Sequence, residues 1–291
     1  MMAMQQANIY EFKSMLFSIA YNMLGTVSDA EDMVQETYVS WLSSDKSHVE
    51  NIKFYLIRTV GNKCIAHLKK LKKERETYKG TWLPEPILST SEAESELKTN
   101  DKLSIGFVYL LERLSPIERA VLILKEAFNF DHSQISEIFD ISYENSRQHF
   151  SRSKKKLALE KTKYKVNTSA HEHILREFLE ACIDNKPARL IELLREDVVV
   201  YADGGGAVKA ILKPIFGKEK VSRLFANGLD QFAQFARLEI LSVNGLSGAA
   251  LYQISGNKCP DVLIAIDTDD NGKIYNVYFM ANPQKIKPID R

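Results

Sequence analysis

The chain has 291 residues, of which 45% are hydrophobic and 26% are charged, with a formal net charge of +1. These values predict about two soluble globular domains and exclude an extreme polyanion or polycation. No apolar run approaches the roughly 20 residues that span a bilayer, and residues 1–10 lack the charged-then-apolar plan of a signal peptide. We therefore expect a cytoplasmic protein with no membrane partner.

The three cysteines Cys64, Cys182 and Cys259 are odd in number and far apart. This spacing supports neither a disulfide framework nor a zinc site. We predict no metal and no cofactor.

The small net charge hides an uneven distribution. Residues 53–79 contain nine Lys or Arg against two Glu, and residues 147–165 contain eight against one. Residues 171–291 contain fifteen basic and sixteen acidic residues. Two basic stripes beside a neutral second half predict that only the first half meets a polyanion.

Residues 8–43 predict two helices that meet at Gly25, because apolar residues recur at helical spacing on both sides of it. The second helix is expected to open at Ser28 with acidic residues in its first turn, where anions complement the helix dipole. By itself, such a start indicates only capping. The outer face of this helix presents Asp29, Glu31, Asp32, Gln35 and Glu36.

Residues 51–78 predict one long helix with a buried apolar face and a basic outer side. Aromatic and basic residues on one segment can hold a separated DNA strand by stacking and phosphate contact. The alternative is a solvated lysine-rich helix end. The candidate DNA contacts are Asn62, Lys63, His67, Lys69 and Lys70.

Residues 114–157 predict three short helices, and they carry the strongest local signals in the chain. Ser115 and Glu118 form a capping box at the start of the first helix. Asp140 tolerates the left-handed conformation of a tight turn before the third helix, which Ser142 caps. This order favours a DNA-binding helix-turn-helix over a solvated basic helix on a helical core.

The third helix supplies side chains suited to DNA. Arg and Gln can read base edges in a major groove, and the cations that follow suit phosphates. The candidate contacts are Tyr143, Glu144, Arg147, Gln148, Ser151, Arg152, Lys154 and Lys155.

These segments resemble a known family. Residues 20–25, residues 29–38 and Trp41 are similar to domain 2 of bacterial extracytoplasmic-function (ECF) sigma factors, and residues 59–64 resemble the promoter-melting segment of that domain. Residues 114–157 resemble domain 4 of the family. The resemblance covers about 150 residues in the right order.

The resemblance implies partners and roles. The acidic helix would dock on the clamp helices of the polymerase β′ subunit, and the β subunit would belong to the same core enzyme. The basic helix would read the −10 element, and the third short helix would read the −35 element. The family often has Ala-Val where this chain has Asn145-Ser146, and a serine facing the core is expected to anchor the helix less well.

Between the two sigma-like domains, residues 79–99 predict a linker. Two prolines around Glu85 enforce an extended backbone. An apolar pair on a stiff tether predicts a docking peptide; the alternative is a loop that buries its own Trp. The segment Trp82, Leu83, Pro84, Glu85 and Pro86 is similar to the linker signature of the sigma factors fused to a SnoaL-like C-terminal domain.

After a polar boundary at 165–169, residues 169–291 predict a separate domain. Helices over 171–184, 187–195 and 217–229 and a strand over 197–201 precede strands at 234–243, 247–254, 260–267 and 273–280. This order predicts an α+β fold with a curled antiparallel sheet. It resembles the SnoaL-like branch of the nuclear-transport-factor-2-like (NTF2-like) cone, whose concave face holds a pocket. The expected architecture is two all-α sigma domains, 1–78 and 100–165, followed by this cone.

The carboxylates of this domain leave two interpretations open. Acid–base chemistry on a small apolar ligand in the pocket could use Asp203, Asp261, Asp267, Tyr201 and Tyr252, but no base is paired with an orienting group in the sequence.

The alternative interpretation is a structural turn that lets a partner approach closely. Two segments resemble motifs of the same subgroup, with Ala207 in place of a lysine and two substitutions in the tail. With the linker, they predict one regulatory contact region: Asp203, Gly204, Gly205 and Gly206, then Asn282, Pro283 and Lys285.

The sequence therefore predicts an initiation factor that is not itself an enzyme and that binds core RNA polymerase and promoter DNA. Two alternatives stay open. One is a ligand-sensing or catalytic domain, of the cyclase or isomerase type, fused to a DNA-binding module. The other is a conventional regulator that never joins polymerase, and the acidic helix over 29–36 argues against it.

Overall fold

The computed structural model describes residues 9–43, 45, 49–88, 103–157, 168–208, 210–227, 235–253 and 259–286. They fall into two compact units. The N-terminal unit contains Met1–Glu76, Glu92–Leu103 and Phe107–Thr162. The C-terminal unit contains Thr77–Ser91, Ser104–Gly106 and Lys163–Arg291. The described start of the predicted linker therefore belongs to the C-terminal unit, and residues 89–99 lie outside the described residues.

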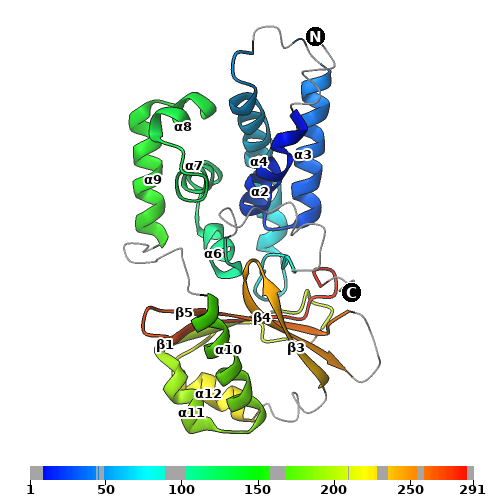
Figure 1. Ribbon diagram of the computed structural model, residues 1–291, viewed down its shortest axis with the longest axis vertical. Helices are drawn as coiled ribbons and strands as arrows, with labels where there is room; N and C mark the ends of the chain where they lie inside the picture. Colours follow the sequence, from blue (N-terminus) through cyan, green and yellow to red (C-terminus); the bar gives the residue numbers. More distant parts are fainter. Residues whose placement is uncertain are drawn as a thin grey trace. The chain divides into compact units, whose positions relative to one another are not determined.

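The first half of the N-terminal unit is helical (Figure 1). Its elements are η1 (Tyr10–Phe12), α2 (Lys13–Leu24), α3 (Val27–Leu42) and α4 (Ile52–Glu76). Gly25 ends α2 with a φ of 77°, a left-handed conformation that glycine adopts without steric cost. The helix α3 begins at Val27, one residue before the predicted Ser28.

The second half of the N-terminal unit contains the predicted helix-turn-helix. Its elements are α6 (Ile105–Leu110), whose first two residues belong to the C-terminal unit, η2 (Leu111–Arg113), α7 (Pro116–Glu126), α8 (His132–Phe139) and α9 (Tyr143–Leu157). The capping box between Ser115 and Glu118 forms as predicted. A second one, between Asp131 and Gln134, starts α8. Asp140 takes the left-handed conformation with a φ of 54°, as the tight turn requires.

The C-terminal unit combines helices with a sheet. Its elements are α10 (Thr168–Ile183), α11 (Pro187–Leu193), β1 (Leu194–Asp203), β2 (Ile215–Phe216), α12 (Lys218–Asn227), β3 (Phe235–Val243), β4 (Leu246–Gln253), β5 (Val262–Thr268) and β6 (Ile274–Met280). The sequence did not predict the short strand β2. Position 234, where the strand predicted over 234–243 begins, and positions 228–229 at the predicted helix end lie outside the described residues.

The sheet corrects one prediction. Its strand order is β2-β1-β6-β5-β4-β3, and β1 pairs with β6 in parallel, so the sheet is mixed and not purely antiparallel. Two strands far apart in the chain can pair in parallel because the long connection between them leaves and returns on the same side. Periodicity within each strand carries no information about this pairing.

The two faces of the sheet have different neighbours. Helices α10, α11 and α12 lie on one side (Figure 1) and pack on the apolar residues of alternate strand positions. This core includes Phe178, Leu190, Val200, Phe225, Ile266 and Val277. Because side chains alternate along a strand, Tyr201, Asp203, Asp267 and Tyr278 point to the opposite face.

No helix within the described ranges is long and apolar enough to cross a membrane.

Candidate polymerase and DNA interfaces and a docked linker

The acidic face of α3 is only partly free. Glu31, Asp32 and Gln35 are exposed on the side opposite the buried face. Asp29 is half-buried, accepts a hydrogen bond from the Thr26 hydroxyl, and lies 3.3 Å from Nε2 of His67. The first of these contacts joins two side chains at the start of α3, and the second ties α3 to α4. The exposed part of the predicted polymerase surface is therefore centred on Glu31, Asp32 and Gln35.

Two exposed apolar residues extend this surface. Val39 and Leu42 are 64% and 53% exposed, and they follow Gln35 at helical spacing on α3. The sequence analysis did not single them out, although the spacing of four and seven residues from Gln35 is visible in it. Apolar side chains flanked by acidic ones are typical of protein-binding surfaces rather than of DNA-binding ones.

The basic side of α4 separates into paired and exposed residues. Asn62, Lys69 and Lys70 are exposed. Lys63 lies 2.9 Å from Oε2 of Glu36, and His67 pairs with Asp29 as described. Two predicted −10 contacts are therefore bound to two predicted polymerase contacts. The reason is that α3 and α4 pack side by side and place opposite charges on adjoining edges.

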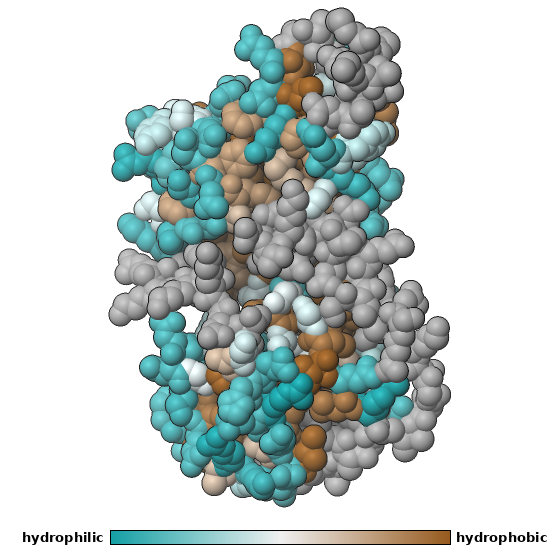
Figure 2. All heavy atoms as spheres, viewed as in Figure 1, coloured by the Kyte–Doolittle hydropathy of each residue, from teal (hydrophilic) through white to brown (hydrophobic). Residues whose placement is uncertain are grey.

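The helix α9 presents its predicted contacts to solvent. Tyr143, Glu144, Arg147, Gln148, Ser151, Arg152 and Lys155 are all exposed. The described surface over α8 and α9 is mainly hydrophilic in Figure 2. The Arg147 guanidinium lies 6.0 Å from the centre of the Tyr143 ring. Lys154 is half-buried, and its ammonium pairs with Glu126 at 3.0 Å.

The serine that departs from the family pattern is better held than expected. Ser146 is fully buried, and its hydroxyl lies 2.9 Å from Nδ1 of His132 on α8. Burial lowers the pKa of His132, with Lys125 and Arg147 adding to the effect, which favours the neutral ring that can accept this bond. The ring also meets Tyr143 and Phe150 edge-on at 6.0 and 5.5 Å. The buried serine therefore has a polar partner on the neighbouring helix, which the sequence analysis did not foresee.

The best-defined polar cluster lies on the face of the C-terminal sheet opposite helices α10, α11 and α12. Asp203, at the end of β1, is 1% exposed and accepts hydrogen bonds from the Tyr78 hydroxyl at 2.5 Å and from the Leu83 backbone N–H at 2.9 Å. Its other donors are the Gly205 N–H at 2.9 Å and the Lys285 ammonium at 2.7 Å. One buried carboxylate thus joins the linker, the glycine turn and the tail.

The positively charged partner of Asp203, Lys285, also contacts the linker. Its ammonium donates to the Leu83 carbonyl at 2.5 Å and lies over the rings of Trp82 and Tyr78, at 4.4 and 5.1 Å from their centres. A desolvated ammonium above an aromatic face is stabilised by the ring quadrupole. Lys285 thus supplies the positive charge at Asp203, and Ala207 stands where the subgroup motif has its lysine.

The remaining predicted residues complete the contact. The Asn282 amide donates to the Tyr78 hydroxyl at 2.9 Å. Gly205 has a φ of 63°, and a Cβ there would overlap the Asn282 carboxamide, so glycine is needed for both conformation and space. Leu83, Pro84, Glu85 and Pro86 are buried. The structure therefore brings the three predicted segments together.

Sequence reasoning missed one further linker contact. Asn244 accepts a hydrogen bond from the Ile87 N–H at 2.9 Å and donates its own N–H to the Ile87 carbonyl at 2.8 Å. Leu88 then pairs with Val243 as an isolated antiparallel bridge. Asn244 and Gly245 form the tight β3–β4 turn, both with positive φ. The Asn-Gly pair could have signalled the turn, but nothing local signals that the turn binds a distant segment.

The predicted acid–base residues do not form one site. Asp203 is taken up by the linker and Lys285, and Asp261 accepts a hydrogen bond from the Gln253 N–H at 2.7 Å. Tyr252 donates to Glu239 at 3.1 Å, and Tyr201 stacks on Tyr278. These contacts give each of the four groups a structural partner.

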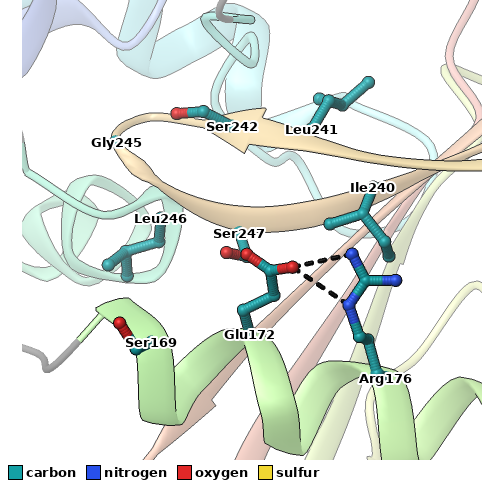
Figure 3. A pocket seen from close by; sticks show the side chains of 9 residues that line it. All are labelled: Ser169, Glu172, Arg176, Ile240, Leu241, Ser242, Gly245, Leu246 and Ser247. Carbon is teal, nitrogen blue, oxygen red and sulfur yellow. Dashed lines mark hydrogen bonds and ion pairs between the residues drawn. The ribbon is translucent and has the colours of Figure 1, made fainter.

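A pocket of about 340 Å³ opens elsewhere, between α10 and the β3–β4 hairpin (Figure 3). Ile240 and Leu246 give it apolar walls, and the ion pair of Glu172 and Arg176, 2.7 Å apart, lies across it. None of the predicted acid–base residues lines it. Within the described ranges, no group of three or more His, Cys, Asp or Glu side chains could hold a metal ion.

Comparisons with known proteins agree with this division. Residues 9–74 match the model for sigma-70 region 2, and residues 107–157 match the model for sigma-70, region 4. The chain is 27% identical over 289 residues to the ECF RNA polymerase sigma factor SigJ of Mycobacterium tuberculosis, which covers 95% of this chain and 92% of the relative. It is 26% identical over 280 residues to the probable ECF sigma factor SigI of the same species, covering 95% and 93%.

The likeness extends to three dimensions over nearly the whole chain. The crystal structure of M. tuberculosis SigJ matches with a TM-score of 0.75 and 26% identity, over 96% of this chain and 98% of that one. The match includes the C-terminal unit, whose helices and curved mixed sheet have the SnoaL-like, NTF2-like fold. With regions 2 and 4 in their usual order ahead of this domain, the chain belongs to the ECF RNA polymerase sigma factors.

Proposed function

We propose that this sigma factor binds core RNA polymerase through the exposed face of α3, reads promoter DNA through α4 and α9, and is regulated by its C-terminal domain through the docked linker. The observation that best supports this proposal is that the acidic and the basic surfaces lie on different helices. An acidic surface with apolar residues lies on one helix, and exposed Arg, Gln and Lys side chains lie on two others. Such a factor works in the cytoplasm, where polymerase and DNA are, and polymerase carries out the chemistry.

The polymerase surface can be tested without harming the fold. Asp32→Ala combined with Gln35→Ala removes two exposed side chains, so the free energy of unfolding should change by no more than about 0.5 kcal/mol. Binding to core polymerase should weaken at least about tenfold, since interface centres carry most of the binding energy. Glu180→Ala, on the exposed side of α10, is the matched control. Wild-type affinity in the double variant would remove α3 from the interface.

The DNA surface predicts two kinds of loss. Arg147→Ala should cost about 1–3 kcal/mol and relax selectivity at one −35 position, because a bidentate guanidinium distinguishes guanine from other bases. Lys155→Ala should weaken all sequences alike and flatten the salt dependence by about one phosphate contact. Binding of polymerase holoenzyme to a −35 library at several salt concentrations measures both. Equal, sequence-independent losses would show that α9 is not the reading helix.

The position of the bound linker supports regulation by the C-terminal domain. Residues 77–88 connect the end of α4 to the rest of the chain, and they are held by buried polar contacts rather than left as a tether. The same contacts cover the sheet face on which Asp203 and Tyr278 lie, which disfavours a catalytic site there. A small ligand remains a proposal; the pocket beside α10 offers it apolar walls and one ion pair.

A further inference from the structure

A second polar cluster lies on the same sheet face as Asp203, and neither the acid–base interpretation nor the linker signature accounts for it. Asp267 on β5 is 8% exposed and accepts hydrogen bonds from the Tyr278 hydroxyl at 2.7 Å and the Asn276 amide at 3.1 Å. Behind it, the buried His171 ring reaches the neighbouring Ile266 carbonyl at 3.0 Å. A carboxylate is costly to bury, so its position calls for an explanation.

Gly106 lies directly against this cluster. A Cβ added to Gly106 would overlap both the Asp267 carboxylate and the Tyr278 hydroxyl. Gly106 is not among the glycines with positive φ, so its backbone conformation would suit any residue. What the position requires is space: only a residue without a side chain can bring its backbone this close to the two oxygens.

The placement of the two clusters is set by the strands. Asp203 pairs with Met280 of β6, Met280 pairs with Leu263 of β5, and Asp267 lies four residues further along β5. With about 4.8 Å between strands and about 3.3 Å per residue, the carboxylates of Asp203 and Asp267 lie roughly 16 Å apart. The chain between Leu83 and Gly106 runs for 23 residues, which could extend to roughly 75 Å.

We propose that Asp267 and Tyr278 form a second anchor, which holds Gly106 and fixes the start of region 4 on the same sheet face that holds residues 77–88. Region 2 ends close before the first anchor, with α4 finishing at Glu76, and the region 4 match begins at residue 107, directly after the second. The two anchors therefore act in addition to the packing of α7 on α2 and α4, and they hold the two ends of the linker about the width of three strands apart.

This inference rests on the proposed function and deepens it. A sigma factor with both ends of its linker held should prefer one spacing between the −35 and −10 elements. Each added base pair moves one element by about 3.4 Å and turns it by about a tenth of a helical turn. Release of the second anchor should let region 4 follow these shifts.

The anchor is tested with full-length Gly106→Val and Asp267→Asn, beside wild type. Hydrogen exchange should show faster exchange over residues 103–108 in both variants, at least about tenfold, because the segment leaves the sheet. Residues 77–88 and strand β6 should stay protected. Asp267→Asn keeps the side-chain shape, so it answers the question if Gly106→Val fails to fold. Unchanged exchange over 103–108 in both variants would overturn the anchor, as would joint loss of protection over 77–88, which would show one docking unit instead of two.

Transcription measures the consequence. With core polymerase and templates whose spacers differ in single base-pair steps, wild type should lose activity about tenfold two steps from its best spacer. Both variants should lose no more than about threefold over the same range. Identical profiles, with the segment released, would overturn the role in spacing. If wild type itself initiates from none of the templates, the proposed function fails, while hydrogen exchange still decides whether the anchor exists.

Discussion

Replacing Asp203 with alanine is expected to release the linker and to destabilise the C-terminal unit by about 3–5 kcal/mol, because removal of one partner leaves a buried charge uncompensated. Asp203 and Lys285 are 2.7 Å apart, and their side chains are 0% and 9% exposed. The loss includes the hydrogen bonds from Tyr78 and Leu83, which hold the linker. Chemical denaturation of the full chain, followed by a domain-specific probe, measures the change.

The chain contains its own control for this prediction. Asp184 and Lys186 are also 2.7 Å apart, but their side chains are 51% and 62% exposed. Asp184→Ala should therefore destabilise the chain far less than Asp203→Ala, because solvent screens an exposed ion pair. Similar losses at Asp203 and Asp184 would show that the cluster does not hold the linker.

The reactivity of Cys259 gives a second measurement of the same release. Its thiol contacts the Ile286 carbonyl at 3.3 Å, so it should react faster with thiol reagents once the tail is free.

Arg119→Ala is expected to have a comparably large effect in the N-terminal unit, again about 3–5 kcal/mol. Arg119 on α7 is 2% exposed, donates to the Met23 carbonyl at the end of α2, and pairs with Glu112 at 2.8 Å. Glu112 also pairs with Arg75 of α4, which donates to the Leu24 carbonyl at 2.7 Å. Two guanidiniums thus bind the C-terminal carbonyls of α2, where cations are favoured.

Loss of Arg119 should leave Glu112 and the Met23 carbonyl with fewer partners and weaken the packing of α7 on α2. Arg113→Ala, exposed on the neighbouring turn, should be nearly neutral. Thermal unfolding of the full-length variants compares the two arginines. Equal stability of both variants would mean that the buried cluster contributes little to the association of regions 2 and 4.

The sequence predicted what depends on local chemistry. The capping box at Ser115, the left-handed Asp140 and the left-handed Gly25 are each fixed by the residue itself and its near neighbours, so α2, α3, α4, α7, α8 and α9 could be placed within a few residues, whereas α6 was not predicted. The three docking segments could be proposed because an apolar pair on a proline tether and a glycine-rich turn each need a partner.

What depends on long-range register could not be read from the sequence. The parallel pairing of β1 with β6, the contact of Asn244 with Ile87 and the placement of Gly106 on Asp267 join residues more than seventy positions apart. Asp203, Asp261 and Asp267 look alike in the sequence, yet an ammonium, a backbone N–H and a tyrosine hydroxyl give them different roles. The pairing of Lys63 with Glu36 was missed for the same reason.

The most direct test of a polymerase-dependent, internally regulated sigma factor is run-off transcription with purified core polymerase, comparing the full chain with a version that ends at residue 168. The full chain should direct core polymerase to specific promoters in a template library, and the shortened version should use the same core enzyme with altered promoter engagement, because its linker has lost Asp203, Asn244 and Lys285. Transcripts that do not depend on the chain, with operator binding by the chain alone, would contradict the sigma function. Identical transcription by the two versions would contradict regulation by the C-terminal domain.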